Sequence, residues 1–592
     1  MSKKIMKTGL ASLITVGFTV GNLSQINGLD IQEESQQEPV ETNETNNEAN
    51  GLENIDNNTS KTSNNRNIIG QTQFVDEEGN IKVIDVTDGT VIQSRAQTSV
   101  NNVVNFNYIG AGTTTTYVDY YSGKTGYISK ASAADAAYLG MENGKVKFMM
   151  AGVIGLVDQS KVQVVNAGNY YVSNYEVNSK GELFHYISNN LNAVGNSNGQ
   201  SANYNAVGKA PSYIKKGIQY YSYDGHYFYN DYNKMISDYK AGTRNNSVNP
   251  DSPYYNYFQY LPYRSTTNYT ASDINNYLNT KKINYNGSTV ALANTPSKLK
   301  NIGETLIFKQ NQYGTNALMI LSLAIHESSW GTSRIALDKN NLFGINATDS
   351  NPYENASTYE SVDACVEYYA SNLVSKGYCN PNSSNYNGSY FGDKGSGMNV
   401  KYASDPYWGE KAAATMMTLD NSSGEKDANK YTIGIKNTIN SSPSTSSVYT
   451  DANTNNKIFD IKGMSNVAFI VKEARGDYYK VQSDAVLNST RTNIDSSSAN
   501  YDFSSMYGYV NKENIKMFGE ISQPANEAPK ISNVKISNVT KNGYTVTATV
   551  TDDTKLDKVL FGTWTTKNGQ DDMVWQPGTI SGNTVTYTVK TS

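Results

Sequence analysis

The chain has 592 residues, several times the roughly 100–150 residues of a single domain, so roughly three to five domains are expected. Hydrophobic residues make up 38% and charged residues 17%, both below the averages for globular proteins, and 46 tyrosines fill part of the difference. The net charge of −5 argues against a nucleic-acid binder, and 3 His with 2 Cys argue against a zinc finger or a histidine metal centre. We therefore expect no nucleic-acid partner, no metal and no cofactor.

The first 28 residues are predicted to be a signal peptide. Lys3, Lys4 and Lys7 precede an apolar run at 10–20, which is too short for a membrane span of about 20 residues. An uncleaved anchor is the alternative interpretation. Residues 29–70 contain no aromatic residue and are predicted to be a disordered linker, because they cannot bury enough apolar surface to offset the entropy of folding.

Two β-rich regions are predicted to follow. Residues 71–175 show short strands separated by turns, with Asn143-Gly144 as a strong hairpin signal. Residues 176–290 form a tyrosine-rich β module. Its clustered rings either stack on sugars or fill small β cores that lack leucine and isoleucine.

The pattern becomes helical over residues 295–425. Apolar residues recur at helical spacing from Ala317 to Ala324, which predicts a helix. Its expected boundaries are an N-cap at Thr315 or Asn316 and a C-cap glycine at Gly331. Two further helices are expected. One is capped by Ser361 and ends before Gly377, and the other begins at Asp405-Pro406.

The C-terminal third is predicted to be β-rich again. Residues 426–447 are polar and rich in serine, as expected of an interdomain linker. Residues 448–520 have the size and rhythm of a small barrel, and residues 527–592 alternate polar and apolar side chains like the strands of a β-sandwich.

Glu327 is the strongest candidate for chemistry. It continues the apolar face of its helix at spacings of four and three from Ile320 and Ala324, just before Trp330. A carboxyl group beside apolar groups and near the negative end of a helix is expected to have a raised pKa, which suits a general acid. The alternative is a helix-end glutamate that turns to solvent or pairs with a cation. His326 points away from it and is expected to be structural.

Two runs, AIHESSWGTSRIALDKNNLFGINATDSNPY and GSGMNVKYASDPYWGEKAAATMM, closely resemble the glucosaminidase domain of glycoside hydrolase family 73. The likeness is greatest to the multi-modular Gram-positive cell-separation enzymes of that family. It implies that residues 295–425 form a mostly α, lysozyme-like catalytic domain flanked by all-β modules. It also implies cleavage of the β-1,4 bond between N-acetylglucosamine and N-acetylmuramic acid, with Glu327 as general acid.

The resemblance assigns further roles. It points to Asp349 as the second carboxylate, with Glu354 and Glu360 as runners-up, although assistance by the substrate's N-acetyl group would need no second carboxylate. Asp349 could instead stabilise its own loop as an Asx-turn residue. Tyr402 matches a tyrosine of the reaction centre, or else fills the core. The remaining substrate-binding candidates are Trp330, Asn341, Phe343, Gly344 and Trp408, whose aromatic members either stack on sugar rings or belong to the core.

Three residues outside this set have simpler expectations. Asp405 is expected to be a helix N-cap. Cys365 and Cys379 either form a disulfide or remain as two thiols.

The flanking regions also resemble known modules. Residues 71–175 and 448–520 are similar to bacterial SH3-like domains, and residues 527–592 to an Ig-like β-sandwich repeat of Gram-positive surface proteins. The resemblance implies a secreted, wall-associated, monomeric enzyme that acts on peptidoglycan glycan strands and holds the cell wall through its β modules. A lytic transglycosylase on the same fold and a non-catalytic wall-binding surface protein are the competing hypotheses.

Overall fold

The computed structural model describes residues 68–76, 79–87, 101–108, 113–191, 202–347, 351–437, 444–453, 456–518, 529–551, 558–564 and 573–590. The predicted signal peptide and almost all of the predicted linker at 29–70 lie outside these residues. The chain forms two compact units, Met1–Ile521 and Ser522–Ser592.

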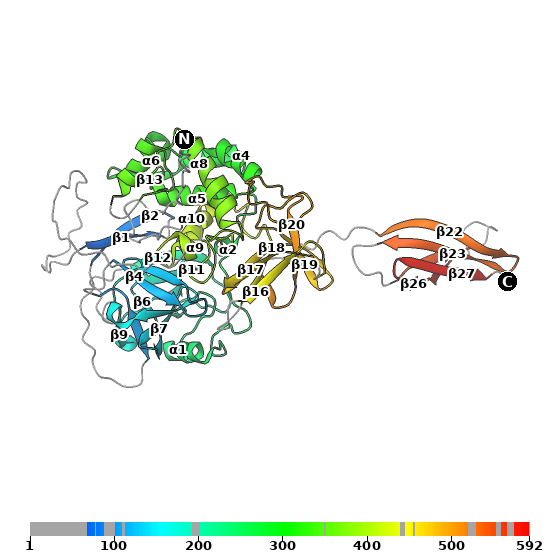
Figure 1. Cartoon of the computed structure of the whole chain (residues 1–592), viewed down its shortest axis with the longest axis horizontal. Helices are drawn as coiled ribbons and strands as arrows, with labels where there is room; N and C mark the ends of the chain where they lie inside the picture. The colour runs from blue at the N-terminus through cyan, green and yellow to red at the C-terminus, as the bar shows by residue number, and fades with distance from the viewer. Residues whose placement is uncertain are drawn as a thin grey trace, which may run out of the picture. The chain divides into compact units, whose positions relative to one another are not determined.

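Helix α5 (Ala317–Ser328) is the centre of the helical region. Asn316 is its N-cap, since its side chain accepts hydrogen bonds from the amides of Leu318 and Met319 at 2.9 and 3.2 Å. Every residue of α5 is buried, so the helix lies inside the domain rather than presenting one apolar face to it. Helix α10 (Trp408–Ser422) packs against it. The surrounding helices are α4 (Gly303–Tyr313), α6 (Arg334–Lys339), α7 (Pro352–Asn355), α8 (Val362–Tyr368), α9 (Asn399–Tyr402) and the π-helix η4 (Tyr369–Tyr378). Figure 1 shows α4, α5, α6, α8 and α10 gathered together, with α1 (Tyr232–Ala241) apart from them beside the N-terminal strands.

Three predicted helix boundaries were wrong. The helix capped by Ser361 does not stop before Gly377 but continues as η4, because the buried side chains of this segment hold it in the core despite the low helix propensity of glycine. Helix α10 starts at Trp408 rather than at Asp405, which instead accepts a hydrogen bond from the amide of Tyr407 in the preceding turn. The C-cap of α5 is Ser329, not Gly331.

The N-terminal β region contains a hairpin and a larger sheet. Strands β1 (Ile68–Val75) and β2 (Ile81–Thr87) pair antiparallel, so the last residues of the predicted linker belong to a strand. Asn143 and Gly144 join β6 to β7 with left-handed φ values of 50° and 77°, which confirms the predicted hairpin. The sheet order is β5-β4-β8-β7-β6-β3-β9, with strands β3 (Asn102–Asn105), β4 (Thr114–Asp119), β5 (Thr125–Ser129), β6 (Asp135–Glu142), β7 (Lys145–Met150), β8 (Val153–Asp158) and β9 (Gln163–Asn166).

The sequence had predicted a β module for the tyrosine-rich region, but the structure shows helices there as well as strands. The region contains helices α1 (Tyr232–Ala241), α2 (Tyr257–Tyr260) and α3 (Ala271–Thr280). The side-chain caps and buried faces of α1 and α3 outweigh the β propensity of tyrosine. Several of its rings, including Tyr223, Tyr229 and Tyr263, are almost completely buried and fill the core. Its strands are β10 (Asn174–Val177), β11 (Glu182–Ser188), β12 (Ala202–Lys209), β13 (Lys282–Tyr285) and β14 (Ser288–Ala291).

The prediction that residues 426–447 form a linker is also wrong in part. Strand β15 (Ile433–Asn437) lies within it and pairs with β18 and β21. One hydrophobic cluster extends from Phe184 through Ile325 to Ile470, so the predicted module boundaries of the first unit do not separate its core. The sheet order is β17-β16-β20-β19-β18-β15-β21, with β16 (Ser444–Tyr449), β17 (Lys457–Met464), β18 (Asn466–Arg475), β19 (Tyr478–Gln482), β20 (Tyr507–Asn511) and β21 (Ile515–Phe518).

The second unit consists of strands alone among its described residues. A four-stranded sheet has the order β22-β23-β27-β26, and β24 pairs with β25. The bounds are β22 (Lys530–Thr540), β23 (Gly543–Thr551), β24 (Leu560–Thr563), β25 (Val574–Pro577), β26 (Thr579–Ser581) and β27 (Thr584–Lys590). Across both units, none of the helices in the described part of the chain is long and apolar enough to span a membrane.

Candidate active site

Glu327 lies in the last turn of α5 with only 1% of its surface exposed. The indole Nε1 of Trp408 donates a hydrogen bond to its Oε1 at 3.1 Å, from the first turn of α10. A hydrogen bond that involves a carboxylate is stronger than one between neutral groups, and a ring in a packed core cannot easily turn away. The structure therefore holds the candidate acid in one orientation.

Tyr402 lies in the same buried cluster, and its predicted place in the reaction centre stays a prediction. Its ring stacks on Trp408 with 4.3 Å between centroids and 29° between planes. Burial and then the charge of the nearby Glu327 raise the pKa of Tyr402 far above its usual value, so its hydroxyl stays protonated. Trp408 is 1% exposed, and its ring also meets Phe391 edge-on, with 5.8 Å between the ring centroids. Trp408 is thus a core residue that contacts Glu327, not an open platform for a sugar ring.

A polar cluster lies behind the helix end. Burial lowers the pKa of His326 to about 4, with the nearby charge of Lys411 adding to the effect. Lys411 pairs with Asp405 at 2.5 Å, and both side chains are buried. The Lys411 ammonium also donates to the hydroxyl of Thr72 on β1 at 3.2 Å. The N-terminal hairpin therefore contacts both α5 and α10, and no local sequence signal indicated these contacts.

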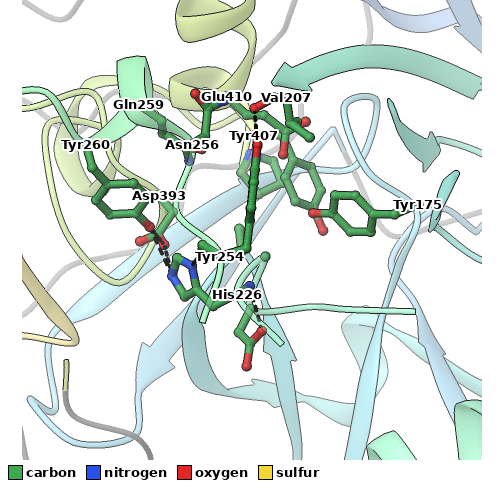
Figure 2. Close-up of a pocket in the computed structure, with 14 residues that line it drawn as sticks. Tyr175, Val207, His226, Tyr254, Asn256, Gln259, Tyr260, Asp393, Tyr407 and Glu410 are labelled. Atoms are coloured by element: carbon green, nitrogen blue, oxygen red, sulfur yellow. Dashed lines mark hydrogen bonds and ion pairs between the residues drawn. The ribbon is translucent and has the colours of Figure 1, made fainter. Parts of the chain in front are cut away.

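A second buried contact ties α10 to the tyrosine-rich region. Glu410 accepts hydrogen bonds from Nδ1 of His185 at 3.0 Å and from the amide of Asn205 at 3.3 Å. Figure 2 shows Glu410 beside a small cavity of about 30 Å³ that His226 and Asp393 also line. These contacts fix the position of α10, which carries Trp408.

The turn after Glu327 has unusual backbone geometry. Ser329, Trp330 and Gly331 have consecutive left-handed φ values of 49°, 62° and 72°. Such conformations cost about 1–3 kcal/mol for a residue with a side chain and persist only where the surroundings impose them. Here Ser297 donates to the carbonyl of Trp330 at 2.6 Å, and the amide of Lys298 donates to that of Gly331 at 3.0 Å.

The side chain of Asn341 organises the NLFGI segment. The Asn341 amide donates to the carbonyls of Ile345 and Ser357, each at 2.9 Å, and its oxygen accepts from the amide of Ile345 at 3.0 Å. Asn341 therefore braces the loop. Phe343 is fully buried and stacks on Tyr369 with centroids 4.0 Å apart, so it too is a core residue here. Gly344 has a left-handed φ of 59°, as the turn requires.

Asp349, the expected second carboxylate, lies outside the described residues. The segments on both sides of it are anchored: Ala347 and Ala356 are buried together, and Lys339 donates to the carbonyl of Ala356 at 2.9 Å. The runners-up, Glu354 and Glu360, are both exposed.

A groove of about 700 Å³ begins beside the turn that follows Glu327. Trp330 lines it together with Lys82 of β2 and Lys282 of β13. The ammonium of Lys281 lies 5.3 Å from the centroid of the Trp330 ring, which is only 7% exposed.

Two expectations about thiols and metals can be compared with the described residues. Cys365 and Cys379 are free and buried, and burial raises the pKa of each thiol to about 12, so the disulfide alternative is wrong. The described part of the chain contains no group of three or more His, Cys, Asp or Glu side chains that could hold a metal ion.

Residues 303–421 match the glucosaminidase family, described as mannosyl-glycoprotein endo-beta-N-acetylglucosaminidase. This part of the chain is a glucosaminidase-family domain. The match covers the helices that place Glu327, Trp408 and Tyr402 together. The helical glucosaminidase domain is thus flanked on both sides by β-rich sequence.

Two relatives, named provisionally as endo-beta-N-acetylglucosaminidases, come from Streptococcus pneumoniae strains TIGR4 and R6. Both are 31% identical over 290 residues, which cover 48% of this chain and 36% and 34% of the relatives. The chain thus spans about a third of their length. Among solved structures, a catalytic mutant of Staphylococcus aureus autolysin E in complex with the disaccharide NAG-NAM is 20% identical, with a TM-score of 0.20 over 33% of this chain and 82% of that one. Autolysin E alone is 18% identical, with a TM-score of 0.20 over 28% and 72%.

Proposed function

We propose that this protein is a secreted peptidoglycan hydrolase that cleaves the β-1,4 bond between N-acetylglucosamine and N-acetylmuramic acid. The observation that carries the proposal is the buried carboxyl of Glu327, held by Trp408 at the end of the central helix of a glucosaminidase-family domain. A buried apolar setting disfavours the charged form of a carboxyl, which suits a group that must donate a proton.

In the proposed reaction Glu327 protonates the glycosidic oxygen as the bond from that oxygen to the anomeric carbon breaks. Water then attacks the anomeric carbon, and its proton returns the site to its starting state. We propose that the Tyr402 hydroxyl, which its raised pKa keeps protonated, donates a hydrogen bond to the substrate or to the water.

A second group must stabilise the positive charge that develops on the sugar. We propose that Asp349, which lies between Ala347 and α7 in the sequence, does so. The substrate's own N-acetyl group is the alternative, and it would need no second carboxylate.

The groove lined by Ser329, Trp330 and Thr332, in the turn that follows Glu327, offers space for substrate. Its lysines, Lys82 and Lys282, suit the acidic groups that decorate a wall polymer. We propose that Trp330 contacts substrate there, whereas Asn341, Phe343 and Trp408 act by holding the site in shape.

The flanking β regions are proposed to hold the cell wall, with residues 448–520 as an SH3-like module and 527–592 as an Ig-like repeat. Binding through these modules would raise the local concentration of substrate for a monomeric, wall-associated enzyme of cell separation or wall turnover. We further propose that the helical domain has a lysozyme-like fold.

The test is digestion of purified peptidoglycan by wild type, Glu327→Gln and Glu304→Gln. Glutamine preserves the acceptor for Trp408 but cannot act as an acid, so Glu327→Gln should lower the rate about a thousandfold or more. Glu304 is an exposed glutamate of the same domain with no proposed role in the reaction, and its variant should keep the wild-type rate. If Glu327→Gln retains most of the activity, the proposed acid is wrong.

A further inference from the structure

A second cavity, of about 220 Å³, lies outside the glucosaminidase domain. Four tyrosines and one amide face it: Tyr170, Tyr171, Gln219, Tyr221 and Tyr232. We call this cavity the tyrosine pocket. Tyr232 is 9% exposed, and the other four side chains are half-buried. The pocket thus has a buried aromatic floor and walls that reach solvent.

The polar groups of the wall are linked to one another. The Tyr221 hydroxyl donates to the Gln219 oxygen at 3.1 Å, and the Gln219 amide donates to the Tyr171 hydroxyl at 3.3 Å. The Tyr221 ring meets Tyr232 edge-on, with centroids 5.5 Å apart and planes at 89°. Burial raises the pKa of both Tyr221 and Tyr232, so these hydroxyls remain neutral donors and acceptors.

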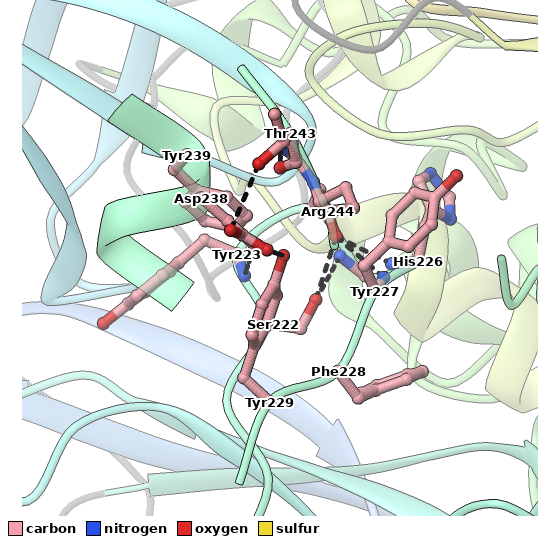
Figure 3. A network of polar contacts seen from close by, with 12 residues as sticks. Ser222, Tyr223, His226, Tyr227, Phe228, Tyr229, Asp238, Tyr239, Thr243 and Arg244 are labelled. Carbon is pink, nitrogen blue, oxygen red and sulfur yellow. Dashed lines mark hydrogen bonds and ion pairs between the residues drawn. The ribbon is translucent and has the colours of Figure 1, made fainter. Parts of the chain in front are cut away.

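The backbone that carries Tyr221 is rigid. Its amide and carbonyl both pair with Tyr229, at 2.7 and 3.0 Å. The following residue, Ser222, donates to Asp224, which is paired with Arg244 at 2.8 Å. Figure 3 shows this network, in which Asp238 and Tyr239 hold the same turn from α1. A ligand would therefore meet a wall that is already ordered, which reduces the entropy lost on binding.

The composition of the wall indicates the class of ligand. No side chain that lines the pocket carries a formal charge. The nearest charges that act on Tyr221 are the carboxylates of Asp231 and Glu176, which disfavour an anion. Tyrosine rings suit the apolar C–H faces of a pyranose, while the amide and hydroxyls can exchange hydrogen bonds with its hydroxyl and acetamido groups.

We propose that the tyrosine pocket binds a neutral N-acetylhexosamine ring. Its volume suits a single ring, since it lies below the roughly 300–1,000 Å³ of pockets that hold drug-sized ligands. The absence of cations in its wall favours N-acetylglucosamine over a muramic acid residue with a free lactyl carboxylate. This binding needs no hydrolysis, so it is independent of the proposed reaction.

The test uses the full chain with Glu327→Gln to prevent turnover, and with 3-fluorotyrosine at position 221 as a local fluorine NMR probe. Triacetylchitotriose should shift the fluorine signal in a saturable manner, whereas trigalacturonic acid and choline should not. A shift by choline alone would assign the pocket to a cation, and a shift by trigalacturonic acid alone would assign it to an anion. Either result, or no shift with chitotriose, overturns the proposal.

Variants give a second readout by calorimetry in the Glu327→Gln background. Gln219→Leu removes the amide, and its affinity for chitotriose at this site should fall about tenfold, the effect of losing roughly 1.4 kcal/mol of hydrogen bonding. Tyr213→Leu, at a half-buried tyrosine outside the pocket, is the matched control and should bind like the parent. Equal affinity of the two variants, with melting temperatures like the parent's, would contradict the proposal. Hydrolysis by the Gln219→Leu chain with Glu327 intact should continue, so failure here and failure of the proposed function are distinguishable.

Discussion

Replacing Trp408 by phenylalanine tests how the candidate acid is held. The change removes the Nε1–H group that donates to Glu327 Oε1 at 3.1 Å but keeps a ring against Tyr402. As Glu327 gives up its proton it becomes a carboxylate, and a hydrogen bond to such a charged group contributes about 1.5–3 kcal/mol. If this loss falls on the chemical step, kcat should decrease roughly 10- to 150-fold, since each 1.36 kcal/mol is a factor of ten.

The assay is the initial rate of release of reducing ends from solubilised peptidoglycan over a range of substrate concentrations. Because Trp408 is buried and acts through Glu327, we expect kcat to fall while KM stays nearly constant. Trp575→Phe is the control, since Trp575 is 61% exposed and lies in the other unit. A folded Trp408→Phe enzyme with kcat within about twofold of wild type would refute the positioning role.

Three further predictions follow from the surroundings of the site. His326 has a folded-state pKa of about 4 against 6.5 when unfolded, so the folded chain binds fewer protons between these values and loses stability as the pH falls. Between pH 7.5 and pH 4.5, the free energy of unfolding measured in urea should fall by about 2.5 kcal/mol more for wild type than for His326→Leu. The same dependence on pH for both proteins would contradict this. Gly331→Ala should destabilise the folded chain by about 2–4 kcal/mol, since the new Cβ would lie 2.8 Å from Ser297 Oγ and 2.9 Å from the Leu299 amide nitrogen. Ser329→Gly should stabilise it slightly in the same urea assay, because Ser329 has a left-handed φ of 49° that glycine adopts without strain. Equal unfolding midpoints for these two variants would be the contrary result. Ellman's reagent should find no fast-reacting thiol in the folded chain and two after unfolding without reductant, while none after unfolding would mean that a disulfide is present.

Local signals predicted the parts of the fold that depend on local physics. The apolar spacing from Ala317 identified α5, the short polar side chains of Thr315 and Asn316 narrowed its N-cap to two candidates, of which Asn316 is the cap, and Asn143-Gly144 identified a hairpin. The strand β15 was missed because its residues lie in a polar stretch and pair only with strands far along the chain. The helices of the tyrosine-rich region were missed because tyrosine favours strands when tertiary contacts are not known.

The sequence predicted the position of Glu327 but not the residues that contact it, and its role as the acid stays a prediction. Periodicity placed Glu327 at a buried helix end, and the structure confirms that position. The role of Trp408 was not predictable, since a tryptophan that stacks on a sugar and one that donates its N–H to a carboxylate have the same sequence signal. The contact of Lys411 with Thr72 joins residues more than 300 positions apart, and no periodicity within a segment reports such a contact.

The most direct test of the proposed function is digestion of peptidoglycan in ¹⁸O-labelled water, followed by reduction and mass spectrometry of the fragments. Hydrolysis through Glu327 predicts N-acetylglucosamine at the new reducing ends, each with one ¹⁸O from the attacking water. Ends formed by 1,6-anhydro-muramic acid, without the label, would contradict the account and assign the site to a lytic transglycosylase. No fragments from any wall would instead favour a wall-binding protein without activity.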